Sequence, residues 1–288
     1  MSNSIAEMIL QGAHQLRKAG VPEPRRESGS LLAHVLGRDR SFIISHAEDA
    51  IDEEQAARFC ELLGRRAQGE PLQYITANQE FFGLDFEVTK DVLIPRPETE
   101  LLVETALKLF ARSTDAFICD VGTGSGCIAV TLAHELLQIR VVALDISPSA
   151  LAVARRNAAR HSVTERIDFI LSDRFAALDA QEPRLSSFDL IVSNPPYVEE
   201  GAVAGLQREV RDFEPRNALA AGPDGLTVIR RLLLEAANFL KPGGYFLFEI
   251  GFNQAAAVEQ LLDPKIWTLM DIHKDLQGIP RTVALQRL

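Results

Sequence analysis

The sequence predicts an α/β protein: a Rossmann-like domain built on a doubly wound parallel sheet, preceded by a small helical bundle and a β-hairpin. Three observations lead to this class. From residue 116 short apolar runs alternate with helical patterns, a glycine-rich loop follows the first such run, and residues 5–70 repeat apolar side chains at helical spacing. We expect a helical domain (residues 1–76), a hairpin linker (residues 77–95) and a Rossmann-like domain (residues 96–288).

The helical domain is expected to hold three main helices. From Ile5 onward, apolar residues recur every three or four positions until residues 20–22, Gly-Val-Pro, stop the pattern, and residues 26–36 resume it. Residues 52–54, Asp-Glu-Glu, open the third helix, because negative charge in a first turn complements the helix dipole. Pro71 follows the end of that helix.

In the linker the spacing of apolar residues changes from a helical to a strand-like period. Residues 82–88 alternate apolar and polar side chains, residues 89–91 read as a turn, and residues 92–94 return as a second strand, which together predict a hairpin. Pro95 and Pro97 then break regular structure, and a helical pattern follows at residues 98–110.

The Rossmann-like domain is predicted from alternation. Short apolar strands are expected at residues 117–121, 141–144, 167–170, 190–192 and 245–250. Helical patterns lie at residues 128–137, 148–161 and 226–240. Because parallel strands need long crossover connections, this order predicts a parallel sheet with helices on its faces.

Composition narrows the function classes. The 288 residues include 30 Lys and Arg against 40 Asp and Glu, a net charge of −10, which disfavours DNA or RNA as substrate because nucleic-acid binders use a basic excess. The three cysteines (Cys60, Cys119 and Cys127) form no Cys-x-x-Cys pair and the six histidines form no cluster, so we expect neither disulfides nor a metal site. With no secretory signal and no long apolar run, we expect a cytoplasmic protein without a membrane partner.

The glycine-rich loop is the first candidate binding element. It follows a predicted strand and opens a helix, and its candidate cofactor-binding residues are Gly122, Thr123, Gly124, Ser125 and Gly126. The next strand ends at Asp145, a carboxylate placed to accept both hydroxyl hydrogens of a ribose. Asp120 precedes the loop, and an acid there suits a cationic, phosphate-free ligand better than a pyrophosphate. The pattern favours S-adenosylmethionine over a dinucleotide.

The second candidate element is Asn194-Pro195-Pro196-Tyr197, which follows the predicted strand at residues 190–192. The Asn194 oxygen and the Pro195 carbonyl can accept the two hydrogens of one planar NH₂ group, and Tyr197 offers a face against which that group can lie. An amide nitrogen is a weak nucleophile, so two aimed acceptors help by positioning it and by stabilising the charge that develops on it. We therefore take Asn194, Pro195, Pro196 and Tyr197 as candidate catalytic residues.

These motifs resemble those of the bacterial release factor glutamine methyltransferases, the PrmC or HemK family, over essentially the whole chain. The resemblance is carried by residues 94–100 (Ile-Pro-Arg-Pro-Glu-Thr-Glu), the loop at residues 120–126, Asp145, residues 194–197 and residues 213–215 (Phe-Glu-Pro). It implies a Rossmann-like S-adenosylmethionine-dependent methyltransferase domain. The implied substrate is the glutamine of the Gly-Gly-Gln motif in class I peptide chain release factors, methylated on its side-chain nitrogen, with the helical domain recognising the substrate.

The resemblance also assigns roles near the donor. The glycine loop, Asp145 and Asn194 would contact S-adenosylmethionine. Apart from the resemblance, Asp173 could hydrogen-bond the adenine amino group or be a solvated acid in a turn. Some relatives carry Trp where this chain has Arg174, whose flat guanidinium can still stack on adenine.

Several alternatives stay open at this point. Glu249 could face the site or end a sheet edge, and Arg96 and Glu98 could close over the donor or link the domains. The same motifs fit a ribosomal-protein glutamine methyltransferase or an adenine-N6 nucleic-acid methyltransferase, since adenine presents a similar NH₂ group. A non-catalytic protein that binds the methyl donor is the remaining alternative.

Overall fold

The structure is a computed structural model that describes residues 4–110, 115–179 and 188–288. It divides into two compact units, one formed by Met1–Asn78 with Gln207–Phe213 and the other by Gln79–Leu206 with Glu214–Leu288. The hairpin therefore groups with the second unit, whereas the sequence suggests a separate linker at residues 77–95. The segment Gln207–Phe213 joins the first unit although it lies far along the chain.

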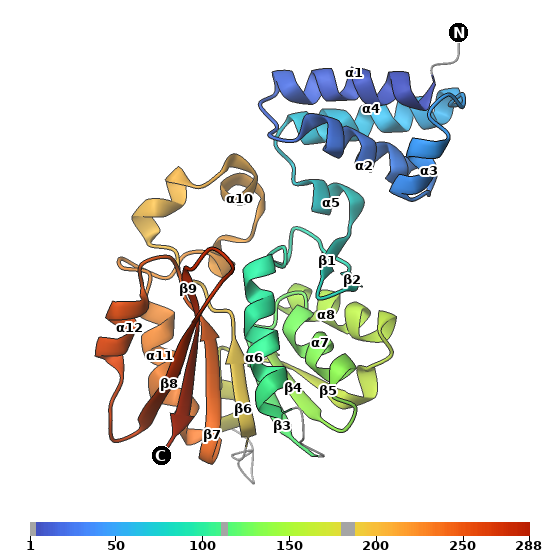
Figure 1. Cartoon of the computed structure of the whole chain (residues 1–288). Coiled ribbons are helices and arrows are strands. Elements are labelled where there is room, and N and C mark those ends of the chain that lie inside the picture. Colours follow the sequence, from blue (N-terminus) through green and yellow to red (C-terminus); the bar gives the residue numbers. More distant parts are fainter. Residues whose placement is uncertain (1–3, 111–114, 180–187) are drawn as a thin grey trace. The chain divides into compact units, whose positions relative to one another are not determined.

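The first unit is helical, as predicted (Figure 1). It consists of α1 (Ile5–Lys18), α2 (Pro24–Leu36), α3 (Arg40–Ser45), α4 (Glu53–Ala67), α5 (Leu72–Thr76) and α10 (Arg208–Phe213). Capping boxes start α1 at Ser4 and α4 at Asp52, which explains why these two helices are readable from sequence. The sequence does not reveal α3 and α5, because six and five residues are too few to establish a helical period.

Buried Arg66 attaches α10 to this helical unit. Its guanidinium pairs with Glu27 of α2 and, at 2.8 Å, with Glu209 of α10, and its side chain is only 5% exposed. The apolar core around which the helices pack includes Leu16, Leu31 and Phe59.

The hairpin exists, but the predicted turn at residues 89–91 and the predicted second strand at residues 92–94 are wrong, and the predicted strand at residues 82–88 contains only β2. The strands are β1 (Gln79–Phe81) and β2 (Leu84–Phe86), and the turn lies at Phe82 and Gly83, not at residues 89–91. Both turn residues have positive φ, 54° and 73°, which is the geometry that a two-residue hairpin turn requires. A phenylalanine in that position hides the turn from a reading of the sequence. Residues 92–94 form no strand and instead bury Val92 and Ile94.

The second unit is built on a seven-stranded sheet in the order β5-β4-β3-β6-β7-β9-β8. The strands are β3 (Phe117–Val121), β4 (Arg140–Asp145), β5 (Ile167–Leu171), β6 (Phe188–Ser193), β7 (Leu240–Glu249), β8 (Trp267–Lys274) and β9 (Pro280–Arg287). The five strands predicted from sequence are present and mutually parallel, so the Rossmann-like α/β class is confirmed.

The expectation of an entirely parallel sheet is wrong at one edge. Strand β9 runs antiparallel to both β7 and β8. Only residues 275–279 join β8 to β9, too few for the crossover that parallel strands need. The sequence hides β8 because most of its side chains are exposed rather than alternating between core and solvent.

Helices cover both faces of this sheet (Figure 1). The first core combines alternate strand residues with α6 (Glu100–Phe110), α7 (Cys127–Glu135) and α8 (Pro148–Arg160). The second core, on the opposite face, takes in α9 (Ala176–Asp179), α11 (Thr227–Glu235) and α12 (Ala255–Leu261). The helix predicted at residues 226–240 ends early, since a 3-10 turn at Ala236–Asn238 leads directly into β7.

In the part of the chain that the structure describes, further 3-10 turns connect the elements at Pro97–Thr99, Thr164–Arg166, Glu200–Gly205 and Arg216–Ala218. Within the described ranges, no helix combines the length and apolar character required to cross a bilayer.

Candidate functional site

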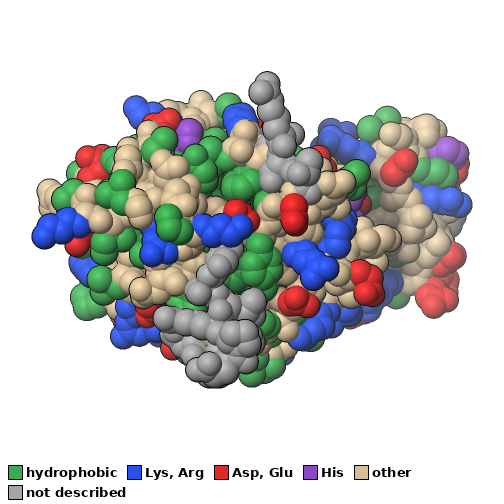
Figure 2. Space-filling view, turned by 90° about the horizontal axis from the view of Figure 1, so that it is seen from below, with side chains coloured by type: hydrophobic (Ala, Val, Ile, Leu, Met, Phe, Trp, Pro, Cys, Tyr) green, Lys and Arg blue, Asp and Glu red, His purple; other side chains and the backbone are tan. Residues whose placement is uncertain are grey.

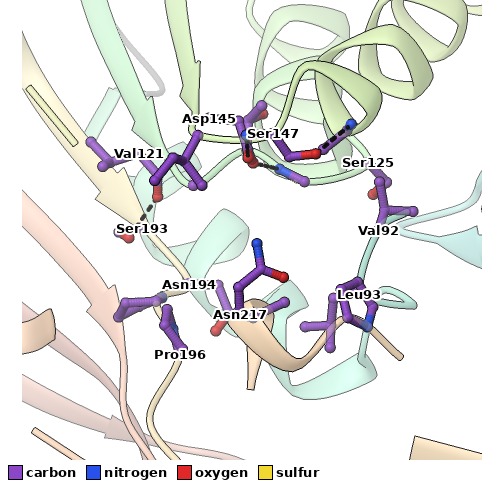
Figure 3. A pocket seen from close by; sticks show the side chains of 18 of the residues that line it. Val92, Leu93, Val121, Ser125, Asp145, Ser147, Ser193, Asn194, Pro196 and Asn217 are labelled. Carbon is purple, nitrogen blue, oxygen red and sulfur yellow. Dashed lines mark hydrogen bonds between the residues drawn. The ribbon is translucent and has the colours of Figure 1, made fainter. Parts of the chain in front are cut away.

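A cavity of about 290 Å³ opens at the carboxyl ends of the parallel strands (Figure 3). Its walls include residues 121–125 at the end of β3, 145–147 at the end of β4, 172–174 after β5 and 193–196 at the end of β6. Ligands of open α/β sheets bind at this edge because the loops there converge from several strands. In Figure 3, Asp145 and Ser147 lie on one side of the cavity, and Asn194 and Pro196 lie on another.

Ten of the predicted site residues line this cavity: Gly122, Thr123, Gly124, Ser125, Asp145, Asp173, Arg174, Asn194, Pro195 and Pro196. Gly126 and Tyr197 do not. Gly126 precedes α7 with φ 81°, and a Cβ there would lie 3.0 Å from the Cβ of Ala154, so its lack of a side chain serves the packing of α7 against α8. Tyr197 points its hydroxyl at Glu249 beside the cavity.

The glycine loop contributes space, and three of its amides already donate to groups of the protein. The amides of Gly122 and Thr123 donate to the carbonyl of Leu144, and the amide of Gly124 donates to Asp145. A Cβ built at Gly122 or Gly124 would meet nothing within 4 Å, and both residues have positive φ. A ligand can therefore approach the loop backbone closely.

Asp120, the acid that the sequence suggests would suit a cationic ligand, does not line the cavity. It is fully buried, and its Oδ2 accepts hydrogen bonds from the Thr123 hydroxyl at 2.7 Å and from the Ala129 amide at 3.2 Å. It thus holds the loop to the start of α7. Burial raises the pKa of Asp120 to about 7, and the charge of Asp145 contributes to the rise.

Asp145 ends β4 with its carboxylate at the cavity. Oδ2 accepts from the amide of Gly124 at 2.8 Å, and Oδ1 accepts from the amide of Ser147 at 2.9 Å. Burial raises the pKa of Asp145, while these backbone hydrogen bonds oppose the rise. The two bonds fix the carboxylate, and each oxygen keeps a further lone pair for a ligand.

Asn194 is oriented by its neighbours. Its Nδ2 donates to the hydroxyl of Thr99 at 2.9 Å, so the other polar atom of the side chain, Oδ1, is the one available to a ligand. Before it, the Ser193 hydroxyl donates to the carbonyl of Val121 at 2.7 Å, which joins the ends of β6 and β3. The following prolines remove two backbone donors from this edge of the cavity.

Arg174 lines the cavity while pairing with two carboxylates. Its Nη1 lies 2.5 Å from Asp173 and its Nε lies 3.0 Å from Glu235. With φ at 50°, the backbone of Arg174 is in the left-handed region. The predicted stacking on adenine would use the face of a guanidinium whose edges are held by these acids.

Several residues that no sequence pattern assigns to the site also line the cavity: Asp91, Val92, Leu93, Thr99, Ser147 and Asn217. The first three were assigned to a turn and strand. Thr99 belongs to the motif at residues 94–100, and Asn217 follows the motif at residues 213–215. In these two motifs the sequence suggests an approach to the donor only for Arg96 and Glu98. The proline breaks at Pro95 and Pro97 are the signal that this segment has its own irregular path.

Comparisons with known proteins agree with these features. Residues 7–76 match the PrmC N-terminal domain family, and residues 113–268 match a methyltransferase domain family. A release factor glutamine methyltransferase of Koribacter versatilis is 45% identical over 93% of this chain and 93% of its own length. A protein of the same name from Nitratidesulfovibrio vulgaris is 43% identical over 99% of this chain and 96% of its own.

A solved methyltransferase structure from Pyrococcus furiosus shares the fold at 19% identity, with a TM-score of 0.51. The match covers 80% of this chain and 98% of that one.

Proposed function

Since the chain belongs to the release factor glutamine methyltransferases, we propose that it methylates the side-chain nitrogen of the Gly-Gly-Gln glutamine in class I release factors. S-adenosylmethionine is the proposed methyl donor. The observation that carries the proposal is the arrangement around one cavity of Asp145 and of the acceptors in Asn194 and Pro195. A bound methyl donor and the amide of the substrate glutamine can meet in this cavity.

The residues present fit the donor. The open space beside Gly122 and Gly124 admits a ligand close to the backbone, and Asp145 is held with lone pairs left for the two ribose hydroxyls. Asp173 is the proposed partner of the adenine amino group, and Arg174 the proposed stacking surface. When bound, the donor supplies a methyl group activated by the positive sulfur.

The chain's own residues then have a positioning task. We assign the acceptance of the two NH₂ hydrogens of the glutamine to Asn194 Oδ1 and the Pro195 carbonyl, which aim the nitrogen at the methyl group. Pro196 helps to keep the backbone of this segment rigid, and Tyr197 is the proposed face for the planar amide. As the nitrogen gains positive character in the transition state, these acceptors stabilise it more than they stabilise the ground state.

The helical unit is proposed to recognise the protein substrate. It carries a groove of about 860 Å³ between α1, α2 and α3. Apolar side chains on the groove include Leu10 and Ile44, which are 56% and 68% exposed. The charged residues of the lining are four arginines, at 25, 26, 38 and 40, so the groove suits a segment that is apolar and acidic.

The direct test is methyl transfer to a purified release factor from donor labelled in its methyl group. We expect one labelled position, the glutamine of Gly-Gly-Gln, and loss of the label when that glutamine is replaced by Ala. Label that survives this replacement contradicts the assignment. Because release factors work on cytoplasmic ribosomes, the enzyme is proposed to act in the cytoplasm.

The same assay can also detect methylation of two other substrates, a glutamine of a ribosomal protein and an adenine of a nucleic acid. On the face drawn in Figure 2, basic and acidic side chains are interspersed among the described residues, without a continuous basic surface. The net charge of −10 favours a protein substrate over nucleic acid. Label in RNA or DNA would reverse that preference.

A further inference from the structure

Glu249 is a buried carboxylate that joins two parts of the site. It ends β7, is 1% exposed, and accepts two side-chain hydrogen bonds. The Thr99 hydroxyl donates to Oε2 at 2.6 Å, and the Tyr197 hydroxyl donates to Oε1 at 3.0 Å. Thr99 lines the cavity and Tyr197 belongs to the Asn-Pro-Pro-Tyr motif.

The two hydrogen bonds that link Asn194 to Glu249 through Thr99 have one possible direction while Glu249 is ionised. A carboxylate only accepts, so the single hydroxyl hydrogen of Thr99 is committed to Glu249. The Thr99 oxygen must then accept from Asn194, whose Nδ2 lies 2.9 Å away. This fixes the orientation of the Asn194 amide and leaves its Oδ1 as the atom available toward the cavity.

We propose that Glu249 is a positioning residue for methyl transfer: through Thr99 it presents the acceptor oxygen of Asn194 to the substrate amide, and it anchors Tyr197 directly. The proposal rests on the proposed function. It assigns a role to a residue that touches neither donor nor substrate.

A neutral amide at this position would disturb one of the two contacts, to Thr99 or to Tyr197. Glutamine offers one acceptor and one donor, so either Thr99 or Tyr197 would receive an N–H. If Thr99 receives it, the Thr99 hydrogen turns toward Asn194, and the amide of Asn194 rotates to point its NH₂ at the cavity. Two donors would then face each other where substrate binds, a repulsive arrangement.

The test compares Glu249→Gln with Thr99→Val and Thr99→Ser in the full-length enzyme. For Glu249→Gln and Thr99→Val we expect kcat to fall by about 100-fold, the usual cost of misplacing a reacting group. The KM for donor should stay within about threefold, because the donor contacts of Asp145 are untouched. Thr99→Ser keeps the hydroxyl and should retain most of the wild-type turnover.

The double variant shows whether Glu249 and Thr99 act on Asn194 by one shared route or independently. If Glu249 acts on Asn194 through Thr99, Glu249→Gln combined with Thr99→Val should lose no more turnover than the more damaging single change. Losses that multiply would overturn the proposed route. Melting temperature and product affinity of each variant show whether the fold and the donor site are intact.

The pH profile gives a readout that packing alone would not move. Burial raises the pKa of Glu249, Glu98 adds to the rise, and Arg281, Thr99 and Tyr197 oppose it. Protonation would turn one carboxyl oxygen into a donor, so kcat should fall as pH falls, and Glu249→Gln should remove this contribution to the acidic limb. A variant with turnover within threefold of the wild type and the same profile would overturn the proposal.

The Asn194 side-chain amide signals in ¹⁵N NMR spectra test the orientation independently of any substrate. We expect them to shift in Thr99→Val and Glu249→Gln but not in Thr99→Ser. Unchanged signals in all three variants contradict the positioning role. A wild-type enzyme that leaves release factors unlabelled contradicts the proposed function instead, and the NMR result still decides the orientation.

Discussion

Arg96 and Glu214 form an ion pair, Nη2 to Oε1 at 2.5 Å, between segments 118 residues apart in the chain. The Glu214 side chain is 1% exposed and that of Arg96 is 31% exposed. Each residue adjoins a cavity-lining one, Pro95 on one side and Pro215 on the other. The pair therefore holds together two segments that line the cavity, and Arg96 has this role in the structure.

Arg96→Ala should cost about 3 kcal/mol of unfolding free energy, because it removes the guanidinium that pairs with the buried carboxylate of Glu214. It should also weaken donor binding, since Asn217 and Pro215 follow Glu214 along the cavity wall. Denaturant unfolding and product-binding titrations measure both effects. Arg216→Ala is the matched control: its pair with Glu200 is largely exposed, so the cost should stay below about 1 kcal/mol. Equal costs for the two variants would contradict this account.

Donor binding and amide alignment should separate in a second pair of variants. Asp145→Ala removes the carboxylate proposed to bind the ribose, so the Kd for S-adenosylhomocysteine should rise by about 100-fold, the loss of two hydrogen bonds to a charged acceptor. Asn194→Ala should lower kcat by about 100-fold or more, with a smaller change in that Kd. Calorimetry and single-turnover kinetics measure the two quantities. If Asn194→Ala leaves turnover unchanged, the proposed grip on the amide is wrong.

The sequence predicts the parallel strands and the loops at their carboxyl ends well, because buried strands and glycine turns leave local signals. Asp145 and Asn194 were found for that reason. Thr99 and Glu249 could not be assigned, because their roles depend on a contact across 150 residues that no local pattern reveals. The prediction of the hairpin turn was wrong for a different reason. Its first residue, Phe82, has an unfavourable positive φ that tertiary structure imposes.

The buried carboxyl group of Asp120 should make the free energy of unfolding depend on pH. Its pKa rises from 3.8 to about 7 on folding, so between these values the folded state holds a proton that the unfolded state has lost. Stability from this group is complete below pH 3.8 and declines as pH rises to about 7. The loss amounts to roughly 4 kcal/mol. Melting curves from pH 5 to 8 should show wild type losing several degrees relative to Asp120→Asn. A constant difference between the two proteins would contradict the raised pKa.

The groove of the helical unit gives the last prediction. Arg25→Glu combined with Arg40→Glu reverses two charges of its lining, and the KM for an intact release factor should rise about tenfold, as expected for charges at the rim of an interface. Turnover of a short Gly-Gly-Gln peptide should not change, because such a peptide needs only the cavity. Steady-state kinetics with both substrates measure this. Arg17→Glu with Lys18→Glu makes the same charge change at exposed positions outside the groove lining. If this control raises KM equally, the effect is long-range electrostatics and the groove is not the docking surface.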